Sequence, residues 1–338
     1  MGDNIVYLVH GMGVFENGWE TSWKNAIIAE ANKYAGVKNN INSLKFYPVT
    51  YYPVIKTILT RWQQDSSSLT PVLSQADPDM VAAVKWLNNA GSTTDFGWTN
   101  VACVVLYRFF SIYRDAILSN ILSQMAPYLL DTLDNHSIIA HSLGTAVIHE
   151  ALCHLANDPS TKNIYGPPSF RFSNMISIAN VSQLLSIAPN DPSTSVVRPG
   201  VASDQSYFDL FLNFHHQLDP IPQLLPFKGF PGSSSSSQYQ SIQLTQIQGK
   251  QLTQQNNPHA FEDYIADPGT HIPIFQILFG PSCITSKESS DSIANFKQSN
   301  PTSTQSDLSN IINSASTIGP KDWQKVISYI VSSFKAMK

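Results

Sequence analysis

Short apolar runs rich in β-branched and aromatic residues recur along the chain, and stretches with helical spacing separate them. Runs of this kind, bounded by polar or glycine-containing segments, are typical of buried strands. The segments expected to be strands are 5–9, 44–49, 138–140, 172–179, 207–214 and 241–247. The last of them alternates apolar and polar side chains, as an edge strand does.

Apolar residues repeated every three or four positions mark the helices between these runs. Helices are expected at 21–34, 52–64, 78–88, 108–133, 145–156 and 323–334. Because strands and helices alternate, we predict an α/β protein with a mostly parallel central sheet and helices on both faces.

The segment from 50 to 135 is longer than a crossover between parallel strands requires. We therefore expect a helical insertion or partial cap at 51–100, before a glycine-containing turn at 140–144. The insertion leaves the carboxyl end of the second strand, which is the edge where α/β sheets bind ligands. Part of it should overhang the functional site.

The remaining pattern fits a single domain covering 1–338. The stretch 281–319 is rich in Ser, Thr and Asn and is expected to be a flexible polar loop. The stretch 320–338 should contain a C-terminal helix. A second polar, proline-containing stretch, 180–204, is a candidate lid.

Composition limits the range of partners. The 338 residues are 42% hydrophobic, which is enough for a large core, but only 13% are charged. The net charge is −4, and Lys and Arg do not cluster. Since binding to a nucleic-acid backbone needs clustered positive charge, a nucleic-acid partner is not expected.

The cysteines and the N-terminus bear on the cellular compartment. Cys103, Cys153 and Cys283 are widely spaced, which argues against a disulfide framework. No leader sequence is seen at the N-terminus, and the longest apolar run, Val101–Tyr107, is too short to span a bilayer. A cytoplasmic location is expected, with export by a leaderless route left open. Nothing in the sequence supports peripheral membrane contact or fixes the oligomeric state.

The stretch from His136 to Glu150 carries the first candidate chemistry. An apolar run leads into AHSLG at 140–144, and a helical pattern follows at once. A strand running directly into a helix leaves a tight turn that needs small flanking residues. Ala140 and Gly144 supply them on either side of Ser142, in an A-x-S-x-G variant of the nucleophile elbow.

A second motif, VHGMG at 9–13, ends the first expected strand, and an Asp and a His follow late strands. This ordered series resembles the α/β-hydrolase superfamily, and within it the lipases and esterases, over most of 5–275. The resemblance implies an α/β-hydrolase fold, no cofactor, and Ser142 as the nucleophile. It also implies an oxyanion hole formed by the backbone N–H groups of Met12 and Leu143.

Two departures from the family pattern matter. Ala140 stands where many members have glycine, although some lipase-like relatives also carry alanine there. The insertion before the elbow has no obvious match in the small lipases, so substrate specificity does not carry over from them.

The acid of the implied triad is Asp219, which follows a hydrophobic strand by a few residues in NFHHQLDPIP. The alternative interpretation is an ordinary Asp-Pro turn. Asp209, inside the strand, and Asp191, after the preceding strand, are the other candidates.

The base is predicted to be His259, with His271 as the alternative. The HAFEDYI context of His259 resembles family members whose catalytic histidine is followed by a tyrosine a few residues on. His141, next to Ser142, is interpreted as a partly buried neighbour of the elbow. No metal site is predicted, because His215 and His216 lie in no metal-binding motif.

These residues together predict a serine hydrolase that cleaves carboxylic esters through an acyl-serine intermediate. The expected partner is a small-molecule or lipid ester. A lipase or phospholipase is one alternative, with Trp86, Trp98, Phe109 and Phe110 lining an acyl groove. Thioester or amide cleavage also stays open, as does an inactive binding protein on the same fold.

Overall fold

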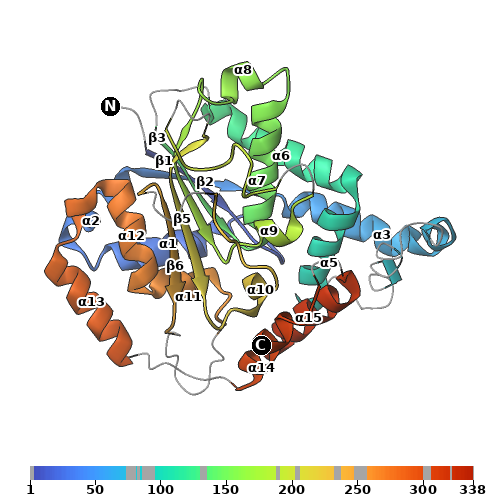
Figure 1. Cartoon of the computed structure of the whole chain (residues 1–338). Coiled ribbons are helices and arrows are strands. Elements are labelled where there is room, and N and C mark those ends of the chain that lie inside the picture. The colour runs from blue at the N-terminus through green and yellow to red at the C-terminus, as the bar shows by residue number, and fades with distance from the viewer. Residues whose placement is uncertain are drawn as a thin grey trace.

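Six strands form one sheet in which every neighbouring pair is parallel (Figure 1). The computed structural model describes residues 4–73, 81, 84–85, 96–129, 135–187, 191–201, 206–231, 237–246, 257–299, 306–319 and 322–337. In spatial order the strands are β2 (Leu44–Val49), β1 (Asn4–Val9), β3 (Asn135–His141), β4 (Phe172–Ile178), β5 (Phe208–His216) and β6 (Tyr239–Leu244). The chain is therefore an α/β protein with a parallel sheet, as the alternating pattern predicts.

Alternate side chains of each strand point to opposite faces of the sheet, so each face has its own apolar core. On β1, Tyr7 belongs to one core and Leu8 to the other. On β5, Phe211 and Phe214 are divided in the same way. Strands covered on both faces read as continuous apolar runs, which is why the sequence reveals them.

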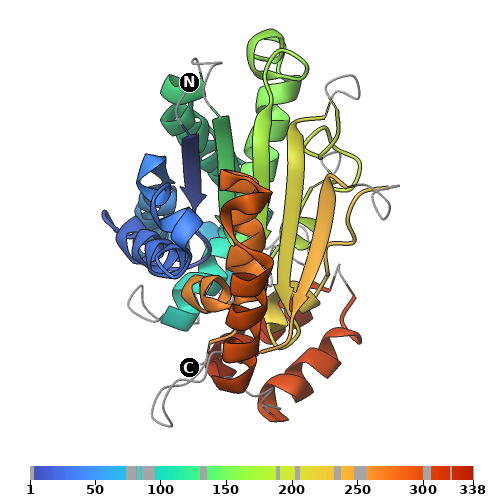
Figure 2. The ribbon, with the colours of Figure 1, turned by 90° about the vertical axis from the view of Figure 1, so that its left-hand side faces the viewer.

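Helices cover both faces (Figures 1 and 2). The core that contains Tyr7 is covered by α3 (Tyr52–Leu73), α5 (Phe96–Phe109), α6 (Ser111–Leu129) and α7 (Leu143–Asn157). The opposite core is covered by α1 (Glu20–Ala31), α2 (Ala35–Lys38), α11 (Phe261–Ala266) and α12 (Pro268–Phe279). Short elements connect the others: η1 (Ile41–Ser43), α8 (Lys162–Tyr165), α9 (Ser182–Leu185), α10 (Pro220–Gln223) and η4 (Pro281–Cys283).

The carboxyl ends of the strands face a cap of helices. In both views α14 (Ser306–Ala315) and α15 (Trp323–Ala336) lie beyond this edge of the sheet (Figures 1 and 2). The Tyr329 hydroxyl of α15 donates to the Pro220 carbonyl of α10 over 3.0 Å. Trp323 packs edge-on against Phe109 of α5. Helix α15 is therefore tied to both α10 and α5.

The region around α5 differs from the sequence-based expectation. One helix is expected at 108–133, but α5 already begins at Phe96 and a break at Phe110 separates it from α6. Residues 101–107 are buried on every side. A helix that is apolar all round has no stripe from which its period can be seen. Most of the helix expected at 78–88 lies outside the described residues.

The prediction of a flexible polar loop at 281–319 is wrong, because this stretch contains η4, α13 (Ser286–Ser299) and α14. A capping box begins α13: the Thr285 hydroxyl accepts from the Glu288 N–H, while the Glu288 carboxylate accepts from the Thr285 N–H. Helix α13 buries none of its side chains, so it lacks the apolar stripe on which pattern recognition depends. Within the described part of the chain, no helix is both long and apolar enough to cross a membrane.

Candidate active site

Ser142 forms the turn between β3 and α7. Its backbone has φ 53° and ψ −126°, in the left-handed region that non-glycine residues adopt at a cost of about 1–3 kcal/mol. The Ser142 N–H donates to the Ile178 carbonyl at the end of β4 over 3.0 Å. The Thr145 hydroxyl donates to the Ser142 carbonyl over 2.7 Å and accepts from the Val181 N–H. Bonds to the neighbouring strand and loop therefore hold the strained turn.

Two glycines let the elbow approach the loop after β1. A Cβ on Gly144 would lie 2.3 Å from the His10 carbonyl oxygen and 2.7 Å from that of Val9. A Cβ on Gly11 would lie 2.8 Å from Cβ of Ser142. The first turn of α7 thus rests directly on the backbone of the HGMG loop. No side chain larger than hydrogen fits at either position.

His10 and Tyr51 fix the shape of the HGMG loop. The Tyr51 hydroxyl lies 2.9 Å from the carbonyl oxygens of both His10 and Gly11, and the Tyr51 N–H donates to His10 Nε2. His10 Nδ1 therefore carries the ring proton and donates to the Gly11 carbonyl over 3.0 Å. The His10 ring stacks between Tyr51 and Phe15. The loop that includes Met12 is consequently held beside Ser142.

Both predicted oxyanion donors lie at this junction. Leu143 is the first residue of α7, and the first N–H groups of a helix have no partner within it. Met12 directly follows Gly11, which touches Ser142. Both residues are buried, so an oxygen held here would be shielded from water.

Asp219 begins the short helix α10 after β5, and its Oδ1 accepts from the Ile221 N–H over 3.1 Å. It is fully buried. His259 Nδ1 lies 2.8 Å from Asp219 Oδ2 and 3.0 Å from Oδ1. Asp219 therefore belongs to an Asp-Pro turn and is also the partner of a histidine, so the two interpretations of this residue are compatible.

His259 joins this carboxylate to the serine, because its Nε2 lies 2.8 Å from Ser142 Oγ. With Nδ1–H donating to Asp219, the neutral ring has Nε2 free to accept the serine proton. The structure thus brings together Ser142, Asp219 and His259 in the chain order expected from the sequence.

His141 does more than the sequence suggested for a neighbour of the elbow. Its Nε2 donates to the carbonyl of His259 over 2.8 Å. Burial and then the nearby His259 ring hold the pKa of His141 well below its usual range, so the ring is neutral. The Asn257 side chain accepts from the His259 N–H at the other side. The backbone of His259 is thus held from both sides. The contact with His141 spans 118 positions, so local sequence patterns do not reveal it.

The alternative residues have other partners. His271 lies on the opposite face of the sheet, where Nε2 is 2.7 Å from the Tyr34 hydroxyl and Nδ1 donates to the Ile265 carbonyl. Asp209 pairs with Arg171 at the surface, and Asp191 caps a turn at Ser193. None of these three residues forms a hydrogen bond or ion pair with His259 or Ser142 among the described contacts.

Apolar helices enclose the three residues. Ser142 and Asp219 have no exposed surface, and His259 is only 5% exposed. The Phe334 ring of α15 lies edge-on to the His259 ring, with centroids 6.0 Å apart. Asn100 of α5 lies beside Gly13, so the start of α5 reaches the HGMG loop. This helix, near one end of the predicted 51–100 insertion, is one wall of the site.

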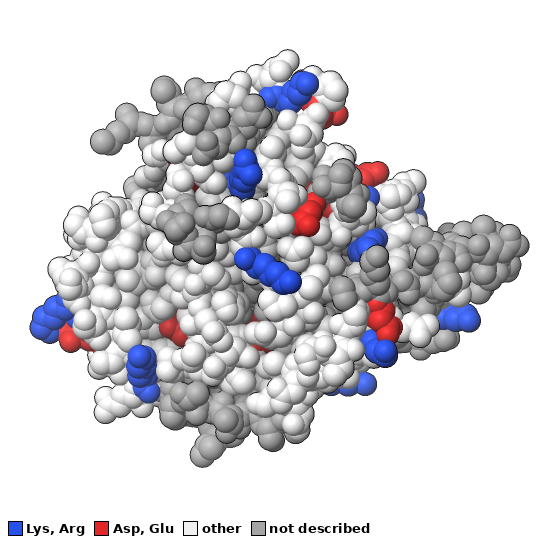
Figure 3. Space-filling view, in the orientation of Figure 1, with Lys and Arg blue, Asp and Glu red and all other residues white. Residues whose placement is uncertain are grey.

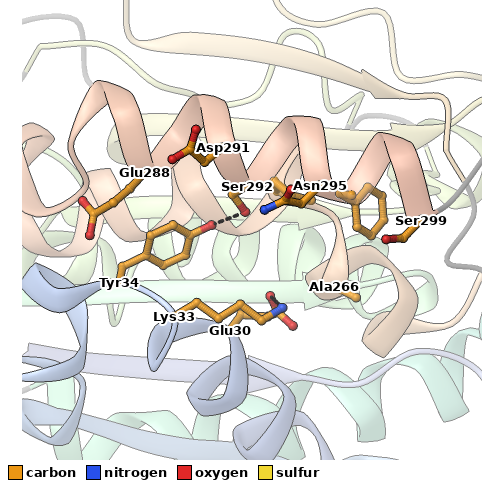
Figure 4. A pocket seen from close by; sticks show the side chains of 11 residues that line it. Glu30, Lys33, Tyr34, Ala266, Glu288, Asp291, Ser292, Asn295 and Ser299 are labelled. Atoms are coloured by element: carbon orange, nitrogen blue, oxygen red, sulfur yellow. Dashed lines mark hydrogen bonds and ion pairs between the residues drawn. The ribbon is translucent and has the colours of Figure 1, made fainter.

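A cavity of about 530 Å³ lies elsewhere, between α1 and α13 (Figure 4). The Tyr34 hydroxyl points across it to Ser292, and Glu288 and Asp291 project from α13. Glu288 already caps α13, and Asp291 pairs with Lys287 over 2.6 Å. These two carboxylates therefore already have partners in α13 or directly before it. Ser142, Asp219 and His259 do not line this cavity.

The described residues contain no group of three His, Cys, Asp or Glu arranged to hold a metal ion. Both ring nitrogens of His216 are occupied, by the Leu218 N–H and the Gln246 carbonyl. The three cysteines are buried free thiols. On the face seen in Figure 3, Lys and Arg side chains are scattered singly and do not form a patch.

Comparison with known proteins identifies no relative: no family model, curated protein or solved structure matches the chain. Any functional assignment must therefore come from the geometry of the site.

Several buried histidines predict sensitivity to mild acid. Burial lowers the pKa of His10 to about 3 and of His149 and His271 to about 4. Below pH ~6.5 these histidines take up protons in the unfolded chain but not in the folded chain, so the free energy of unfolding decreases as the pH is lowered. At pH 5 each of these rings should lower the free energy of unfolding by roughly 2 kcal/mol relative to neutral pH. Asp267 acts in the opposite sense, because burial raises its pKa to about 6, but it offsets only about 1 kcal/mol.

Thermal denaturation between pH 8 and pH 5 measures this effect. The midpoint should decline steadily below pH ~6.5. A midpoint that stays constant down to pH 5 would contradict the neutral, buried state of these rings.

Proposed function

We propose that this chain is a serine hydrolase of the α/β-hydrolase type that cleaves carboxylic esters. The observation that carries the proposal is the hydrogen bond of 2.8 Å between Ser142 Oγ and His259 Nε2, with Asp219 on the other side of the ring. The parallel sheet and the location of the three residues at the carboxyl ends of its strands also support it.

In the first half of the reaction Ser142 Oγ attacks the ester carbonyl carbon while its proton passes to His259 Nε2. The tetrahedral intermediate collapses, the C–O bond to the alcohol breaks, and His259 gives its proton to the leaving oxygen. In the second half water attacks the acyl carbon and gives a proton to His259. The bond between that carbon and Ser142 Oγ then breaks, the carboxylic acid leaves, and His259 returns the proton to Ser142. Asp219 keeps the imidazole oriented and stabilises its positive charge.

The backbone N–H groups of Met12 and Leu143 are assigned to the oxyanion. Because the HGMG loop and the start of α7 are locked together, these two donors would already be in place before charge develops. Preorganised donors of this kind contribute about 3 kcal/mol each to the transition state.

The apolar surroundings favour a second candidate, hydrolysis of lipid esters with long acyl chains. Phe334 lies against His259, and the buried apolar residues of α5 belong to the same core as Leu143. Transfer of an acyl chain from water to these apolar surroundings would stabilise binding by about 0.8 kcal/mol per buried CH₂.

Two measurements on the folded protein test the proposal. A fluorophosphonate probe should label Ser142 covalently, as mapped by peptide mass spectrometry. A series of p-nitrophenyl esters from acetate to palmitate then gives kcat/KM against chain length. An optimum at short chains supports a carboxylesterase, and an optimum at long chains supports a lipase.

Absence of both labelling and turnover would instead support an inactive binding protein with the same fold. Labelling with no ester turnover would direct attention to thioester or amide substrates, because the same nucleophile attacks them.

A further inference from the structure

Tyr264 of α11 places its hydroxyl between the acid and the end of β5. The hydroxyl donates to Asp219 Oδ2 over 2.9 Å, and it accepts from the His216 N–H over 2.9 Å. The Tyr264 side chain is buried, 2% exposed. Nothing in the sequence pattern assigns it a partner, because Tyr264 and Asp219 are 45 positions apart.

The direction of the phenol proton follows from its partners. A backbone N–H can only donate, so the Tyr264 oxygen must be the acceptor toward His216. The phenol proton is then directed to Asp219. Burial and the Asp219 charge raise the pKa of Tyr264 well above its usual range, so the proton stays on the phenol. A donor that itself accepts a hydrogen bond is polarised and donates more strongly.

Asp219 therefore accepts hydrogen bonds from three directions. The Ile221 N–H reaches Oδ1, the Tyr264 hydroxyl reaches Oδ2, and His259 Nδ1 lies across both oxygens. The first two bonds fix the plane of the carboxylate, and that plane aims its oxygens at the imidazole. They also offset part of a negative charge that has no contact with water.

We propose that Tyr264 is a positioning residue for the ester hydrolysis described above, on which this inference rests. It orients the Asp219 carboxylate toward His259 and, by sharing its charge, limits how strongly the carboxylate holds the imidazolium. It acts through Asp219 and does not touch the serine.

Removal of the hydroxyl has two consequences that point in defined directions. In Tyr264→Phe the charged Asp219 carboxylate loses one of the hydrogen bonds that it accepts. As a result kcat should fall roughly ten- to hundredfold with KM little changed. The less compensated carboxylate favours the imidazolium form of His259, so the acid limb of the kcat/KM profile moves to higher pH.

Tyr34→Phe is the matched control, since the Tyr34 hydroxyl is also buried between two partners in the same core as Tyr264, but these partners are His271 and Ser292 and not Asp219. It should leave the acid limb where the unaltered protein has it. If Tyr264→Phe fails to fold, 3-fluorotyrosine at position 264 keeps the bond with a stronger donor. The acid limb should then move to lower pH.

The experiment compares the unaltered chain with these variants in p-nitrophenyl acetate turnover over the pH range in which circular dichroism shows them folded. Proton NMR of protein with ¹⁵N-labelled histidine adds a readout that needs no turnover. The His259 Nδ1–H resonance should move downfield in Tyr264→Phe and stay in place in Tyr34→Phe.

An acid limb and an Nδ1–H resonance that do not change in Tyr264→Phe would overturn the role of Tyr264, even in an active enzyme. A chain that neither turns over esters nor reacts with fluorophosphonate would refute the proposed function instead. In that case the NMR comparison still decides whether Tyr264 tunes the Asp219–His259 pair.

Discussion

Ser142→Ala is expected to lower the rate of the proposed ester hydrolysis by about 10⁴-fold or more, because a triad without its nucleophile retains only binding and oxyanion contacts. His259→Ala should cause a loss of similar size. Stability should change little in Ser142→Ala, since the hydroxyl bonds only to His259 among the described contacts. Turnover of p-nitrophenyl esters and thermal denaturation measure the two quantities.

The comparison with His271 makes this test specific. His271→Asn disturbs a buried hydrogen-bonded ring on the opposite face of the sheet, so it should lower the denaturation midpoint while the folded protein keeps its kcat. The assignment of the base would have to be abandoned if His271→Asn lost turnover and His259→Ala kept it.

Gly144→Ala is expected to destabilise the fold by about 3 kcal/mol, a large part of the stability of a typical domain. The added methyl would meet two backbone carbonyl oxygens, at 2.3 and 2.7 Å, and neither can swing away as a side chain could. The elbow and the HGMG loop would have to separate, so esterase activity should fall together with stability. Urea denaturation followed by fluorescence gives the free energy of unfolding.

Gly319→Ala is the control for this substitution. A methyl at that position meets no atom within 4 Å, so the free energy of unfolding should change by less than about 0.5 kcal/mol. Equal stability losses in the two variants would mean that the close approach at Gly144 is not what limits the substitution.

The strands and the elbow could be predicted because both follow from local rules. Strands buried on two faces are unbroken apolar runs, and a sharp turn from strand to helix selects small residues around the serine. The parallel order then places the ends of β1, β3 and β5 at one edge, so the positions of Ser142 and Asp219 follow from topology. For the histidine, the sequence offered His259 and His271, and only the resemblance of the HAFEDYI context favoured the first.

What the sequence could not provide are contacts between distant residues. The bond from His141 to the His259 carbonyl spans 118 positions, and the bond from Tyr264 to Asp219 joins a helix after β6 to the turn after β5. The helices at 286–299 and 306–315 were missed for another reason. The first has no buried face, and its T-x-x-E capping box is a short signal within a polar stretch.

The parallel order of the sheet has a kinetic consequence. Each strand must wait for a crossover before it can pair, and Ser142 meets His259 across 117 residues. Chains dominated by such distant contacts fold slowly, commonly in milliseconds to seconds, after local helices have formed. During refolding, helical circular dichroism should therefore return well before reactivity toward fluorophosphonate. The proposed nucleophile would thus report on completion of the whole sheet, and a partly folded chain would carry a serine without its chemistry.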